Sequence, residues 1–181
     1  MANTFAQSNI WANKFFQTMN DSNGISMKML IEQRQFDNTS TEVGQIEILK
    51  KKHFILDLPY ESVYVVADTI KTWNKTTNQL IIDQNISRGV NIFDILTGSF
   101  EEIEFGIPKE SKNYVQMDFN VPQLGYGGEL IIETNGVPNL IRLIYSPNQA
   151  ISLTIQDFQK GNLKLYDGFN PDGAEVIDLR E

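Results

Sequence analysis

The sequence contains no cysteine and only one histidine, His53. Without cysteine, the chain forms no disulfide and carries no thiolate nucleophile or thiolate metal ligand. With one histidine, a zinc site built on several histidines is also excluded. His53 follows three lysines at the start of a strand-like segment, so we expect a solvated turn residue there and no metal site.

Basic residues are also scarce relative to acidic ones. The chain has 15 Lys and Arg against 23 Asp and Glu, which gives a formal net charge of −8. This balance argues against nucleic-acid binding, which favours a basic surface, and against nonspecific binding to anionic lipid. No apolar run approaches the roughly 20 residues that span a bilayer.

Motifs that carry catalysis or bind nucleotides are missing as well. There is no G-x-S-x-G nucleophile elbow and no phosphate-binding P-loop. The glycines of 125–128 fit a hairpin turn, the glutamates of 101–104 fit a solvated helix face, and Asp68 fits a turn. We therefore predict that the protein is not an enzyme, with no catalytic residues and no cofactor.

The length of the chain is typical of a single domain. It has 181 residues, of which 41% are hydrophobic, so we expect a single domain over residues 1–181 with a sizeable core. Near the start, Thr4-Phe5-Ala6 has small residues at the spacing of a signal-peptidase site. We expect an exported protein whose signal has been removed.

The stretch from Gly44 to Gln84 organises the chain. Apolar residues alternate with polar ones in short segments separated by turn-forming residues, which predicts a meander of antiparallel strands. Before it, a helix is predicted from about Ser8 to Met19, then a strand over Ile25–Phe36 and a polar loop over Asp37–Glu42. After it, short helices are predicted over Asn91–Leu96 and Ser99–Phe105. Strands are then predicted over Tyr114–Val121, Glu129–Thr134, Pro138–Tyr145, Ala150–Phe158 and Asn162–Tyr166.

So many consecutive antiparallel strands are expected to curl into a barrel or half-barrel. Periodicity alone leaves an antiparallel barrel and a sandwich both open. The apolar faces of the strands and helices suggest which side chains line a cavity on the concave side. Core packing is the alternative for each of them. The candidates are Phe15, Phe16, Met27, Met29, Phe54, Leu56, Trp73 and Phe93.

The same stretch resembles the LolA/LolB family of periplasmic outer-membrane lipoprotein carriers. The residues that fall in the family's order are Gly44, Lys50-Lys51, Phe54, Pro59, Asp68, Trp73 and Gln79. The sequence departs from the pattern where the family has Pro, Gly and Tyr, at Lys52, Thr69 and Lys75. The tail from Phe169 to Asp178 is similar to the family's ending, so the resemblance covers almost the whole chain in order.

The resemblance implies a mainly β (α+β) fold: an open, incomplete antiparallel β-barrel of about 11 strands with helices covering the concave face. It implies a periplasmic carrier that shields lipoprotein acyl chains in an apolar cavity and delivers them to the outer membrane. The implied partners are an inner-membrane release complex and an outer-membrane acceptor, with the carrier itself a monomer. By position, Lys51 matches a lid latch of the family, although a solvated lysine cluster at a hairpin tip explains it equally well.

Two other functions stay open. One is a different lipid-binding or envelope-sensor module on the same half-barrel. The other is an enzyme acting on sugar or lipid inside a β-barrel, which is the weakest of the three because no acid–base constellation is visible in the sequence.

Overall fold

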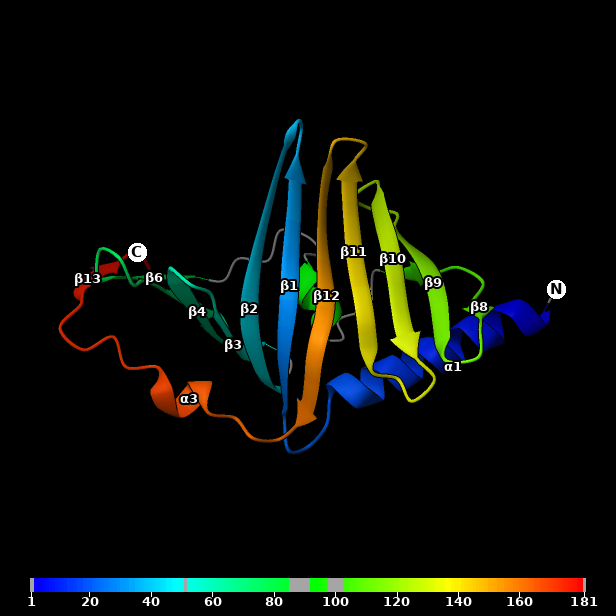
Figure 1. The fold of residues 1–181 in the computed structure, drawn as a ribbon, viewed down its shortest axis with the longest axis horizontal. Coiled ribbons are helices and arrows are strands. Elements are labelled where there is room, and N and C mark those ends of the chain that lie inside the picture. Colours follow the sequence, from blue (N-terminus) through cyan, green and yellow to red (C-terminus); the bar gives the residue numbers. More distant parts are fainter. Residues whose placement is uncertain (1, 51, 85–91, 98–102, 181) are drawn as a thin grey trace.

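The computed structural model describes residues 2–50, 52–84, 92–97 and 103–180. These residues form one twisted sheet, with two helices on one of its faces and a short third helix on the other (Figure 1). The helices are α1 (Ala2–Met19), α2 (Ile92–Leu96) and α3 (Leu165–Gly168). The strands are β1 (Ile25–Gln35), β2 (Asn38–Lys50), β3 (His53–Asp57), β4 (Glu61–Val66), β5 (Thr69–Asn74), β6 (Gln79–Gln84), β7 (Glu104–Phe105), β8 (Lys109–Glu110), β9 (Tyr114–Val121), β10 (Tyr126–Glu133), β11 (Pro138–Ser146), β12 (Gln149–Lys160) and β13 (Glu175–Asp178).

The sheet is open. Its strand order is β13-β6-β5-β4-β3-β2-β1-β12-β11-β10-β9-β7, with β8 also paired to β9. Neighbours are antiparallel except for β13, which lies parallel to β6. The expected open antiparallel half-barrel is thus confirmed, with 13 strands in the described residues where about 11 were predicted.

Strand alternation places the core on one face of this sheet. In β1, Met27, Met29 and Ile31 are buried, whereas Lys28 between the methionines and Glu32 after Ile31 are exposed. In β9, Val115, Met117, Phe119 and Val121 are buried in the same alternating way. We call the face that carries the core and contacts α1 and α2 the concave face, and the other the convex face.

The first two strands form one long hairpin, which corrects the predicted polar loop over residues 37–42. The ladder runs without interruption from Ile25↔Ile48 to Gln35↔Asn38. Phe36, at a φ of +54°, helps to make the turn. The segment is polar because it is exposed to water on both faces, so its composition is typical of a loop although its backbone is paired.

The C-terminal segment crosses the convex face and returns to the far edge of the sheet (Figure 1). Its strand prediction over residues 162–166 is wrong, because the chain makes the short helix α3 at that point. The fully buried carboxylate of Glu47 accepts hydrogen bonds from the backbone N–H groups of Lys164 (2.8 Å), Leu165 (2.8 Å) and Tyr166 (3.3 Å). These are the donors that a helix start leaves without partners, so Glu47 stabilises the helical turn.

The helix predicted over Ser99–Phe105 is wrong at its C-terminal end. Glu104–Phe105 forms strand β7, paired with Asn120 and Phe119 of β9. Residues 98–102 lie outside the described part of the chain. The helix over Asn91–Leu96 is confirmed as α2.

Candidate functional site

A largely apolar pocket of about 310 Å³ lies on the concave face, over strands β1 to β5 and next to β12. Three successive strands supply its floor at alternate positions. Phe54 pairs with Val65, which pairs with Ile70; in the next row Leu56 pairs with Val63. Such a pocket lies at the lower end of the range that buries a small-molecule ligand.

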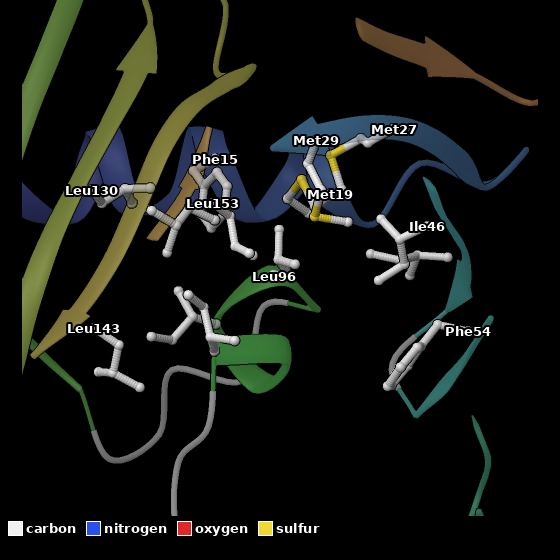
Figure 2. Close-up of a cluster of buried hydrophobic side chains, with 14 of the residues drawn as sticks. Phe15, Met19, Met27, Met29, Ile46, Phe54, Leu96, Leu130, Leu143 and Leu153 are labelled. Carbon is white, nitrogen blue, oxygen red and sulfur yellow. The ribbon is translucent and has the colours of Figure 1, made fainter. Parts of the chain in front are cut away.

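The helices explain why the pocket lies on this side of the sheet. Phe15 and Met19 of α1, with Ile95 and Leu96 of α2, fill the concave face over the central and later strands. Figure 2 shows Phe15 beside Leu153 and Leu96 below the methionines of β1, with Phe54 at the far side of the cluster. Most of this packing lies over one half of the concave face, and the pocket lies over the other half, beside α2.

The helix α1 is held firmly in this position. Its Lys14 ammonium donates to the carbonyl of Thr134, and its Thr18 hydroxyl donates to the carbonyl of Asn135 at 3.4 Å. Gly136, at a φ of +94°, permits this approach, because a Cβ there would lie 2.8 Å from the Lys14 carbonyl oxygen. With the fully buried Phe15, these contacts make α1 part of the core.

The aromatic ring of Phe93 in α2 covers the pocket. It stacks on Phe54 with ring centroids 5.8 Å apart and an interplanar angle of 21°. Phe93 is only half-buried, and the short helix that carries it ends with the Thr97 hydroxyl bonded to the Phe93 carbonyl at 2.9 Å. The stack brings α2 into direct contact with the pocket floor.

Charged side chains stand around the apolar floor. Glu42, Glu61 and Asp94 contribute carboxylates, and Lys52 contributes an ammonium group. Lys52 also lies 3.6 Å from the highly exposed carboxylate of Asp68. The described lining is therefore apolar in its centre and predominantly acidic at its rim.

The structure divides the eight predicted cavity residues into separate groups. Phe54, Leu56 and Phe93 line the pocket. Phe15, Met27 and Met29 lie on the same face but in solid core, with at most 1% of each exposed. Phe16 is 39% exposed on α1. Lys51, the predicted latch, lies outside the described residues.

Trp73 is placed differently from the prediction. It lies in β5 an odd number of residues from Ile70, so its side chain emerges on the convex face. There its ring meets Phe169 edge-on at 6.4 Å, and its indole N–H donates to Asn78 at 3.0 Å. Trp73 therefore fixes the C-terminal segment to the sheet and does not line the pocket.

His53 also belongs to the convex face, and its expected place in a solvated turn is wrong. It is the first residue of β3, half-buried, with its ring 5.3 Å from that of Tyr166 and 6.1 Å from that of Tyr64. Burial, with a smaller contribution from Lys50, holds the pKa of His53 below its ordinary value. Burial also raises the pKa of the Tyr166 phenol well above its usual range.

The sequence reasoning missed Val63, Val65 and Ile70, which complete the pocket floor. A signal for them was present. Once β3 is paired with β4 and β4 with β5, the partners of Phe54 and Leu56 must share their face.

A second and more open depression lies over β9, β10 and β11. It has a volume of about 910 Å³ and includes Tyr126 and Tyr145 with the polar Asp118 and Asn120. Because it is wider and more open to solvent, it encloses less of a ligand than the pocket beneath Phe93, which we take as the candidate site.

Within the described residues, no helix is long and apolar enough to cross a membrane. No group of three or more His, Cys, Asp or Glu side chains is arranged there to hold a metal ion.

Comparisons with known proteins find similar folds among solved structures. No protein-family model matches the sequence, and no curated protein matches it. An uncharacterized conserved protein from Thermus thermophilus is similar in structure, with a TM-score of 0.62 and 11% identity over 95% of this chain and 99% of that one. A DUF1329 family protein from Desulfovibrio piger has a TM-score of 0.50 and 8% identity, over 90% of this chain and 96% of that one.

The similar structures also include a LolA superfamily protein from Nitrosomonas europaea. It has a TM-score of 0.49 and 9% identity, over 88% of this chain and 96% of that one. Likenesses at identities this low concern the fold alone.

Proposed function

We propose that this protein is a periplasmic carrier that shields an acyl chain of a lipoprotein in the pocket beneath Phe93 and delivers it towards the outer membrane. The observation that carries the proposal is the pocket itself. It is apolar, built on a rigid sheet, and covered by a half-buried aromatic ring on a short helix. The ordered sequence motifs that resemble the lipoprotein carriers support the same function.

The size of the pocket bears on how cargo is held. A volume of about 310 Å³ is small for a ligand of several chains, so one chain enters at a time unless α2 moves away. Burying each CH₂ group is worth about 0.8 kcal/mol relative to water. Transfer from one membrane to another is nearly neutral in free energy, because both ends of the path are apolar. The direction of delivery must then come from partners.

The proposal is tested by blocking the pocket. Val63 is half-buried on the floor of the pocket, and Val66 is half-buried on the convex face of the same strand. Val63→Trp fills the pocket, so we expect the affinity for a neutral acylated dipeptide amide to fall at least about tenfold. Val66→Trp is the matched control and should bind like the wild type.

Binding is measured by displacement of a neutral naphthylamine fluorophore, with the unacylated dipeptide as a second control. Equal affinity in the two tryptophan variants and the wild type would rule out the pocket as the binding site. Binding of the unacylated dipeptide as tightly as the acylated one would rule out recognition of the chain.

The alternative is a lipid-binding or envelope-sensor module on the same half-barrel. The two functions differ in what happens to the cargo. A carrier loaded with lipoprotein transfers it to acceptor liposomes without ATP, whereas a sensor retains its ligand and changes its affinity for a protein partner.

A further inference from the structure

We infer that the pocket beneath Phe93 selects amphiphiles with a cationic head, such as an acylated peptide whose first residues are basic, and discriminates against anionic ones. This inference rests on the proposed function and specifies the chemical class of its cargo. It follows from where the charges lie around the pocket.

Two carboxylates stand at the same end of the apolar floor. Glu42 pairs with Ile31 in the β1–β2 ladder, one alternate position beyond Gly44. Glu61 lies one alternate position beyond Val63 in β4, and its backbone carbonyl accepts from the N–H of Leu58 at 2.8 Å. The floor therefore runs from the Phe54 row through the Leu56 row to an acidic end.

Apolar side chains close the end of the floor next to these carboxylates. Gly44 has no side chain, and a Cβ there would lie 2.7 Å from Leu58 and 3.2 Å from Ile31. The apolar residues Leu58 and Ile31 therefore close over the glycine, and the carboxylates of Glu42 and Glu61 are the polar groups next to them. A chain lying on the floor would bring its head to these carboxylates.

Lys75, near this end of the floor, donates to the Leu58 carbonyl at 2.6 Å and is paired with Asp57 at 2.7 Å. The lysine that lines the pocket lies elsewhere. Lys52 lines the opposite end, beside Phe54 and Val65, and is paired with Asp68. The basic residues of β1, Lys28 and Arg34, emerge on the convex face, and Arg34 donates to the carbonyl of Pro147 at 2.9 Å. A cationic head at the acidic end thus meets two carboxylates, and no lysine or arginine among the described pocket residues stands beside it.

Complementary charge at the rim of an apolar site governs which partner is accepted more than how tightly the apolar part binds. An anionic head would be repelled by the carboxylates that attract a cationic one. One exposed ion pair between a carboxylate and a ligand head contributes little to the binding free energy. Here two carboxylates contribute together, and both attract a cationic head and repel an anionic one. We expect decyltrimethylammonium to bind about tenfold more tightly than decanesulfonate, a preference that added salt reduces.

The test compares three ligands with equal chains: the ammonium, the sulfonate and a neutral decyl amide. In Glu42→Gln/Glu61→Gln the preference for the ammonium should disappear, while the affinity for the neutral amide stays within about twofold. The control Glu32→Gln/Asp172→Asn removes the same charge from the exposed Glu32 on the convex face and the exposed Asp172 in the C-terminal segment. This control should keep the preference.

The outcomes separate the two proposals. Equal binding of the ammonium and the sulfonate to the wild type would overturn the charge selection while leaving acyl-chain binding in place. A preference that persists unchanged in Glu42→Gln/Glu61→Gln would assign it to the overall charge of the chain and overturn the proposed role of the rim. Failure of all three ligands to bind would overturn acyl-chain binding and this inference with it.

Discussion

Glu47 gives the sharpest prediction about how the C-terminal segment is held on the sheet. Its buried carboxylate accepts three backbone N–H bonds from residues 164–166. Glu47→Gln keeps the shape of the side chain but replaces one accepting oxygen with an NH₂ group. The replaced oxygen accepts either from Lys164 or from both Leu165 and Tyr166, so one or two hydrogen bonds are lost. The new NH₂ group then faces a backbone N–H, and neither group has an acceptor in the other.

The magnitude follows from the bonds lost. A hydrogen bond to a charged group contributes about 1.5–3 kcal/mol, and a buried donor left without a partner costs about 1–3 kcal/mol. We therefore expect the segment from α3 to β13 to lose about 2–4 kcal/mol of local stability. If this segment opens as a unit, amide exchange in β13 should accelerate by about 30- to 1,000-fold.

Hydrogen exchange followed by mass spectrometry measures this effect directly. Peptides covering residues 164–178 should exchange faster in Glu47→Gln, whereas peptides from β1 should not change. Glu32→Gln, which alters an exposed carboxyl of the neighbouring strand on the same face, is the control. Binding of the neutral acyl ligand should also be unchanged, because the pocket is on the concave face. Unchanged exchange at residues 164–178 would refute the role assigned to Glu47.

Two further predictions concern the core and the convex face. Met29→Ala should lower the free energy of unfolding by about 2–5 kcal/mol in urea titrations, because Met29 is fully buried; Lys28→Ala, at an exposed position of the same strand, should change it little. For His53, the pKa is lower in the folded protein than its ordinary value near 6.5. The unfolded chain therefore takes up the proton first, and stability should fall as the pH drops below about 6.5. His53→Gln should flatten that part of the stability profile; an unaltered profile would contradict the assigned burial effect.

Much of the fold could be predicted from the sequence because alternation is a local signal. The meander over residues 44–84 and the strand at 114–121 carry apolar residues at every second position, and each appears as predicted. The error at the C-terminal segment arose because the decisive contact is distant in sequence. The chain turns into α3 at Leu165 because Glu47, more than 100 positions away, accepts hydrogen bonds from the N–H groups of Lys164 and Leu165.

The site could be predicted only in part for the same reason. Strand alternation predicted that Phe54 and Leu56 share one face of the sheet. Whether an apolar residue lines a cavity or packs solidly depends on where the helices lie. Met29 and Phe54 share a face, but α1 covers Met29 and leaves space beside Phe54. Trp73 lies on the other face because it is three residues from Ile70 in β5, and side chains an odd number of positions apart point to opposite faces.

The central claim is that the pocket beneath Phe93 buries an acyl chain, and a chain-length series of neutral acyl amides tests it most directly by calorimetry. Burial of each added CH₂ is worth about 0.8 kcal/mol, so the affinity should rise about fourfold per carbon and then level off once the pocket is full. In Val63→Trp the levelling-off should come at a shorter chain. An affinity that does not depend on chain length, or a series that is identical in the wild type and Val63→Trp, would contradict the account.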